Sequence, residues 1–140
     1  MSEITGLQVA TVQPPHHLGK YDIYGISRID WHDGFLLVVM NNKYHLAHLV
    51  FDGPLSFRSQ DEHDMLDYWQ AQRKENTPAA TLFKVGRSPY LDQFKGMGIS
   101  GDHEFGLSLW LLVGIDQCLE VITLANEVPS LTWWALDPSE

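Results

Sequence analysis

The chain has 140 residues and a formal net charge of −9, from nine Lys and Arg against 18 Asp and Glu. This length fits one domain that buries about 68% of the surface of its unfolded chain. The acidic balance argues against nucleic acid as a direct ligand, because phosphate binding depends on clustered basic side chains.

The first predicted elements are strands. We expect residues 1–20 to be a partly flexible N-terminal segment containing one short strand over 7–12, and a second strand to cover 21–31. Asp33-Gly34 then predicts a hairpin turn, since both residues tolerate positive φ. The six apolar residues 35–40 predict a strand buried on both faces, and residues 44–51 its antiparallel partner.

Two helices are predicted in the middle of the chain. A short strand over 55–58 is followed by Ser59-Gln60-Asp61-Glu62, which matches a capping box and predicts a helix that begins after Ser59. Residues 81–85 predict another strand. Ser88-Pro89 then predicts a second helix with Ser88 as its N-cap and Pro89 at its first position, where the missing N–H costs nothing. Gly96 ends it.

Three further strands are predicted over 104–113, 118–124 and 131–135, with a turn at 114–117. Runs of strands with few helices are typical of the α+β class. We therefore expect residues 1–140 to form a single globular domain, a mainly antiparallel sheet of about eight strands with two helices packed on it.

The compartment is predicted from absences in the sequence. Cys118 is the only cysteine, which excludes an internal disulfide and is compatible with a reducing compartment. Residues 1–10 contain no Lys or Arg and no long apolar core, unlike a secretory leader. We therefore expect a cytoplasmic protein of bacterial type without a membrane association.

Candidate catalytic residues are sparse. Asp30, His32 and Asp33 surround Trp31 and could belong to a carboxylate–histidine site of a small hydrolase or ligand-binding enzyme. The pair His45 and His48 lies three residues apart on a predicted strand, so the two rings point to opposite faces and cannot share one metal ion. We expect no metal and no cofactor.

Charge is distributed unevenly along the chain. All Lys and Arg lie in residues 1–95, whereas residues 96–140 contain Asp and Glu but no Lys or Arg. This asymmetry favours a basic protein as partner, with Asp116 and Glu120 as exposed charges. Trp133 and Trp134 are adjacent on a strand and point to opposite faces, so one of them is a candidate aromatic anchor for the contact. Ordinary solubility is the alternative explanation of the acidic charge.

The residues also carry a resemblance. Leu49 to Gly53, Leu55 to Arg58, Ser88 to Leu91 and Cys118 to Val121 resemble a group of small uncharacterised bacterial proteins. Proteins of this size and build are similar to immunity proteins of bacterial toxin systems. The acidic charge, the lack of a catalytic set and the small single-domain build favour a non-enzymatic, protein-binding domain, and the resemblance implies its specific form, an immunity-type inhibitor of a basic bacterial toxin. A small enzyme and a homo-oligomeric structural protein remain the alternatives.

Overall fold

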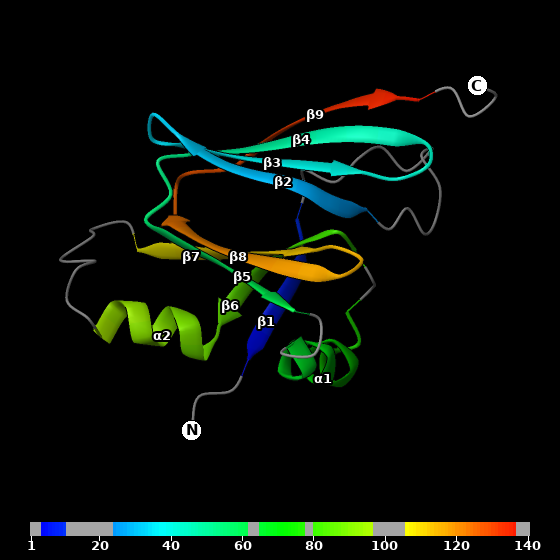
Figure 1. Cartoon of the computed structure of the whole chain (residues 1–140). Helices are drawn as coiled ribbons and strands as arrows, with labels where there is room; N and C mark the ends of the chain where they lie inside the picture. Colours follow the sequence, from blue (N-terminus) through cyan, green and yellow to red (C-terminus); the bar gives the residue numbers. More distant parts are fainter. Residues whose placement is uncertain (1–3, 11–23, 62–64, 78–79, 97–105, 137–140) are drawn as a thin grey trace.

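The computed structural model describes residues 4–10, 24–61, 65–77, 80–96 and 106–136. These residues form nine strands in two sheets and two helices, stacked in three layers (Figure 1). The elements, in chain order, are β1 (Thr5–Val9), β2 (Gly25–His32), β3 (Phe35–Asn41), β4 (His45–Asp52), β5 (Ser56–Asp61), α1 (Leu66–Glu75), β6 (Leu82–Arg87), α2 (Pro89–Gly96), β7 (Leu107–Val113), β8 (Gln117–Leu124) and β9 (Ser130–Ala135). The α+β class is confirmed, but there are two sheets and nine strands rather than one sheet of about eight.

The first sheet has the order β2-β3-β4-β9, and all its neighbours are antiparallel. The predicted hairpin between β2 and β3 is confirmed: Asp33 and Gly34 have φ values of 51° and 80°, as a two-residue turn of this type requires. Between β3 and β4, Asn42 holds the turn, because its Oδ1 accepts hydrogen bonds from the backbone N–H groups of Tyr44 and His45, both at 2.8 Å.

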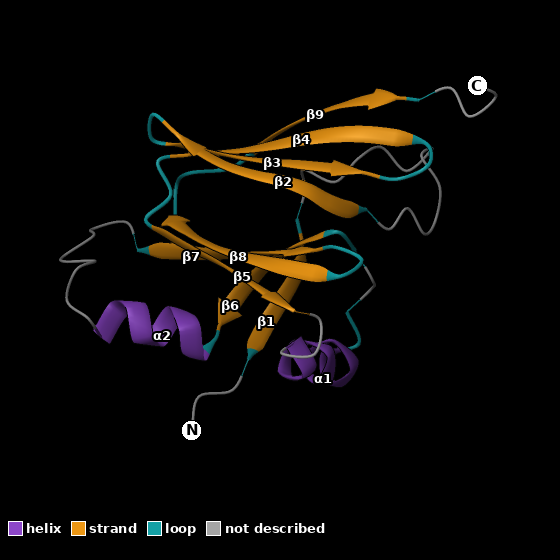
Figure 2. Cartoon of the chain, in the orientation of Figure 1, coloured by secondary structure: helices purple, strands orange, loops and turns teal. Residues whose placement is uncertain are grey.

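The second sheet has the order β1-β6-β7-β8-β5, again antiparallel throughout. Its central strands β7 and β8 are covered on both faces, since the four-stranded sheet lies on one side and both helices lie on the other (Figure 2). The long apolar runs of β7 and β8 follow from this position in the middle layer.

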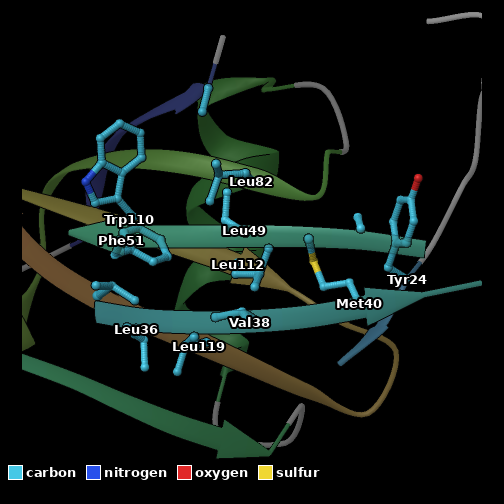
Figure 3. Packing of buried hydrophobic residues seen from close by; sticks show 13 residues of the cluster. Tyr24, Leu36, Val38, Met40, Leu49, Phe51, Leu82, Trp110, Leu112 and Leu119 are labelled. Carbon is cyan, nitrogen blue, oxygen red and sulfur yellow. The ribbon is translucent and has the colours of Figure 1, made fainter. Parts of the chain in front are cut away.

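The main core lies between the two sheets. Inward-facing side chains of β3 and β4, among them Val38, Leu49 and Phe51, meet Trp110, Leu112 and Leu119 from the other sheet (Figure 3). Burial in β3 alternates along the strand, because its outer face has no described element over it. The prediction that residues 35–40 are buried on both faces is therefore wrong.

A second core attaches the helices to the five-stranded sheet. Met65 and Tyr68 of the α1 region and Leu91 and Phe94 of α2 pack against the opposite side chains of β6, β7 and β8. The two cores share strands but use alternate residues, so Leu111 faces the helices while Leu112 faces the other sheet.

The two predicted helix caps had different outcomes. At α2, Ser88 Oγ accepts a hydrogen bond from the Leu91 N–H at 3.2 Å, and Pro89 opens the helix as predicted. Ser59 is not a cap: it lies inside β5, and its hydroxyl contacts Gln117 Oε1 at 3.0 Å. Helix α1 begins later, at Leu66, without a side-chain cap, and Glu62 lies outside the described residues. Pairing with β8 extends β5 through Ser59, Gln60 and Asp61, the first three residues of the predicted capping box.

Neither described helix has both the length and the apolar character needed to cross a bilayer as a helix.

Candidate functional site

The four residues predicted to bind a partner lie in different places. Asp116 is exposed in the turn between β7 and β8, and Trp134 is 45% exposed on the outer face of the four-stranded sheet. Trp133 is half-buried on the opposite face, where its ring lies edge-on to that of His45 at a centroid distance of 5.7 Å. The prediction that the two tryptophans point to opposite faces is confirmed.

The structure does not bring Asp116 together with these tryptophans. The turn that carries Asp116 packs beside β2, since the neighbouring Ile115 N–H donates to the Tyr24 carbonyl at 3.0 Å. β2 and β9 are opposite edges of the four-stranded sheet. Asp116 can therefore influence a partner on β9 through its charge only, not through a shared contact cluster.

The expectation that Glu120 is exposed is wrong. Its side chain has no exposed surface and lies on the helix side of β8, between Cys118 and Ile122. Strand register explains the position, because Glu120 lies directly opposite Arg58 of β5. Arg58 Nε donates to Glu120 Oε1 at 2.6 Å, and one terminal nitrogen of Arg58 contacts Oε2 at 3.4 Å.

Two further donors complete the shell of this carboxylate. Gln60 Nε2 donates to Glu120 Oε1 at 2.9 Å, and the Tyr68 hydroxyl of α1 donates to Oε2. Beside it, the Arg58 guanidinium lies over the ring of Tyr90 at 4.1 Å, and the Tyr90 hydroxyl is 2.6 Å from Ser56 Oγ. We call these six side chains the Glu120 network. It joins β5 and β8 to both helices.

Electrostatics keep the two phenols of the network neutral. Burial raises the pKa of Tyr68 far above its ordinary value, and the negative charge of Glu120 and the hydrogen bond to it raise it further. Burial is also the main cause that raises the pKa of Tyr90. Both hydroxyls therefore remain protonated at neutral pH, where Tyr68 serves as a donor.

The Glu120 network behaves as a structural unit. Both oxygens of the carboxylate already accept hydrogen bonds, and Arg58 balances the charge. A buried carboxylate with its lone pairs occupied has little capacity left to bind a substrate or abstract a proton.

The alternative enzyme site is open to solvent. His32 Nε2 lies 3.1 Å from Asp33 Oδ2, but the two side chains are 80% and 81% exposed at the hairpin tip. Asp30 pairs instead with Arg28, at 2.8 Å. Water surrounds these groups, so the geometry provides neither the desolvation nor the positioning on which acid–base catalysis depends.

The two histidines of β4 lie on opposite faces, as predicted. His45 is buried beside Trp133, whereas His48 is half-buried on the outer face, where its ring packs edge-on to that of Trp134 at 4.8 Å. Within the described parts of the chain, no three His, Cys, Asp or Glu side chains are grouped so that they could hold a metal ion.

An apolar surface remains on the outer face of the four-stranded sheet. Strand register places alternate residues of β3, β4 and β9 there, and no described element lies over them. We call these residues the outer-face patch: Phe35, Leu37, Val39, Leu46, Val50 and Trp134. Phe35 is 46% exposed and Trp134 45%, while the other four are half-buried, and His48 lies among them opposite Val39.

Sequence reasoning missed both the Glu120 network and the outer-face patch. A signal for the first was present, since Glu120 is the one charged residue in the otherwise apolar run from Cys118 to Ile122. The second could not be found without the order of the strands.

No family model matches the chain, and neither a curated protein nor a solved structure is significantly similar to it. The resemblance to small bacterial proteins thus remains an expectation from the sequence.

Proposed function

We propose that this chain is a non-enzymatic, protein-binding domain that contacts its partner through the outer-face patch. The observation that carries the proposal is the patch itself: six apolar side chains on one face of three neighbouring strands, with His48 among them, without a described element over them. Large apolar surfaces mark interaction sites in proteins. Trp134 is the proposed anchor, because tryptophan is enriched among the residues that dominate binding energy.

The proposed partner is a basic protein. The chain carries a net charge of −9, and the exposed acids Asp33, Asp52 and Asp116 lie on or beside the four-stranded sheet. Complementary charge mainly raises the association rate. An immunity-type inhibitor of a basic bacterial toxin is the specific form of this function that the resemblance suggests. Burial removes Glu120 from the set of contact residues.

The two alternatives receive less support. A hydrolase or ligand-binding enzyme around Asp30, His32 and Asp33 would need an enclosed site, and the His32–Asp33 pair is solvated. A homo-oligomeric structural protein would also use the outer-face patch. Charge disfavours it, because each copy would bring the same acidic surface to the contact.

The test compares three tagged baits in extracts of the source cells: the unmodified chain, Trp134→Ala and Leu66→Ala. Leu66 is the matched control, because it is 63% exposed but lies on α1, in a different layer. We expect the unmodified chain and the control to capture the same basic protein. With that protein purified, we expect Trp134→Ala to weaken binding about 30-fold, the effect of losing an anchor of about 2 kcal/mol.

Surface plasmon resonance at several salt concentrations tests the charge argument separately. The association rate should fall as salt rises, and Asp116→Asn should flatten that dependence. An acidic partner, an affinity that Trp134→Ala leaves unchanged, or the absence of any captured protein would refute the proposal. Concentration-dependent self-association that Trp134→Ala abolishes would favour the homo-oligomer instead.

A further inference from the structure

Two exposed aromatic rings close one side of the gap between the two sheets. Trp31 of β2 and Phe57 of β5 stack with their ring centroids 5.7 Å apart and their planes at 28°. Both rings lie on the inner faces of their sheets, because Trp31 is opposite the buried Leu36 and Phe57 is opposite the buried Val121. β2 and β5 are edge strands on the same side of the stack (Figure 1), so Trp31 is still 49% exposed and Phe57 38%. We call these two residues the aromatic pair.

The indole of Trp31 has the capacity to bind a cation. Elsewhere in the chain Lys43, Arg58 and Lys84 each lie over an aromatic ring, at 4.1 to 5.7 Å from its centroid. Indole binds cations better than the rings of Tyr and Phe do. Yet within the described residues the ring contact of Trp31 is the stack on Phe57 alone, and about half of its surface remains open to solvent.

The charges around the aromatic pair leave a local excess of acid. Arg28 and Asp30 of β2 balance each other, with 2.8 Å between their charged atoms. Asp33 at the tip of the hairpin is 81% exposed, and Asp52 is exposed opposite Phe35, the first residue after the turn. Neither acid has a Lys or Arg partner in the described part of the chain. This end of the four-stranded sheet therefore attracts a positive charge.

Trp134 provides a comparison within the same sheet. It is 45% exposed, close to the value for Trp31, but it lies on the opposite edge strand. The nearby charge has the opposite sign, since Lys43 precedes Tyr44, whose carbonyl accepts a hydrogen bond from the Leu136 N–H at 2.6 Å. A cation should therefore prefer Trp31 to Trp134.

We infer that the aromatic pair binds an arginine side chain of the basic partner. The inference rests on the proposed function and specifies a partner residue that engages the chain beside the outer-face patch. A guanidinium is planar, so it stacks on the indole of Trp31 while its N–H groups are free to pair with a carboxylate such as that of Asp33. Strands spaced by about 4.8 Å place β2 about 14 Å from β9. One partner on the outer-face patch reaches both edges, because a standard interface covers about 800 Å² on each side.

The test follows the indole N–H resonances of the full chain labelled with ¹⁵N. The probe is N-acetyl-arginine amide, and the control is N-acetyl-citrulline amide, which has the same length and a planar end group but no charge. We expect the Trp31 resonance to shift saturably with the arginine probe, with a Kd about two- to fivefold lower than for the citrulline control, the factor that an exposed cation–π contact contributes. The Trp134 resonance should shift less than that of Trp31.

Three variants test the assignment of the contact. Trp31→Leu retains an apolar side chain over the gap but removes the indole, and it should abolish the preference for arginine, read from the Phe57 amide. Trp134→Leu is the matched control and should leave the preference unchanged. Asp33→Asn keeps a residue that tolerates the positive φ of this position and should weaken binding of the arginine probe only.

Several results would overturn the inference. These are equal Kd values for the two probes, a Trp134 shift as large as that of Trp31, or no saturable shift of Trp31. A Trp31 shift that depends on protein concentration without a probe would also overturn it, because a second copy would then be the occupant.

These outcomes are separable from those of the proposed function, because the probe assay needs no partner. Failure of the outer-face patch is read from Trp134→Ala in the capture and binding assays. With the purified partner, Trp31→Leu should weaken binding about two- to fivefold, by the loss of the same contact. If Trp134→Ala weakens binding while Trp31→Leu does not, the inference fails and the proposed function stands.

Discussion

Removal of the Glu120 carboxylate should strongly destabilise the fold. In Glu120→Ala, the donors of Arg58, Gln60 and Tyr68 lose their acceptor together. Removing one partner of a buried ion pair costs about 3–5 kcal/mol. The Arg58 side chain is 41% exposed, so water can replace part of what it loses, which favours the lower end. We therefore expect a loss of about 3 kcal/mol in the free energy of unfolding.

Urea denaturation at neutral pH measures this loss. With a typical slope of about 2 kcal/mol per molar urea, the midpoint should fall by about 1.5 M at unchanged slope. Asp116→Ala is the matched control: this carboxylate is exposed in the turn before the same strand, and its removal should change stability by less than about 0.5 kcal/mol. A loss below about 1 kcal/mol for Glu120→Ala, at equal slope, would refute the assignment of Glu120 as the centre of a buried network.

Three further predictions follow from single side chains. The pKa of Tyr68 is raised above its ordinary value of 10.0, so as pH rises the Tyr68 hydroxyl ionises first in the unfolded chain. The stability that Tyr68 contributes is therefore present below pH 10 and lost as pH rises above it. The difference in urea midpoint between the unmodified chain and Tyr68→Phe should narrow from about pH 9 to about pH 11, and a constant difference would contradict the raised pKa. Ser88→Ala should lower the free energy of unfolding by about 0.5–2 kcal/mol, as loss of a helix cap does, whereas Ser59→Ala, measured in parallel, should stay near neutral. Trp110→Ala should lower the free energy of unfolding by about 3–5 kcal/mol, because it leaves a cavity between the sheets. Trp134→Ala should leave the thermal midpoint nearly unchanged, because Trp134 is exposed on the outer face. Equal effects of the two substitutions would mean that the buried and the exposed face of the sheets are assigned wrongly.

Local chemistry predicted much of the secondary structure. The turn at Asp33-Gly34 needs two residues that tolerate positive φ, and the start of α2 needs a side-chain oxygen followed by a residue without an N–H. Both features depend on a few consecutive residues. For this reason they could be predicted from the sequence.

The same reasoning failed where a distant strand competes. Ser59 begins a sequence that matches a capping box, yet it pairs opposite Leu119 of β8, far away along the chain. A ladder of hydrogen bonds with β8 satisfies the backbone N–H and C=O groups of this segment as fully as a helix start would. The local pattern was compatible with either structure, and the partner strand decided between them.

The outer-face patch was likewise determined partly by the sequence and partly by the tertiary structure. Alternation along β9 determined from sequence that Trp133 and Trp134 lie on opposite faces, because successive strand residues always do. Which of the two faces is covered depended on how the sheets stack. That arrangement left Trp134 exposed and packed Trp133 against the core.

The sequence by itself determined the α+β class, the hairpin at Asp33-Gly34 and the cap of α2, since each follows from the preferences of neighbouring residues. Only the tertiary structure decided that the strands divide into two sheets, that both helices lie on the five-stranded sheet, and that Glu120 is buried with Arg58 rather than exposed. The physical reason is that the burial of a strand residue depends on which sheet or helix covers its face. A charged residue on a strand can lie inside when the register of another strand brings its counter-charge opposite, and register is set by residues far away in the chain.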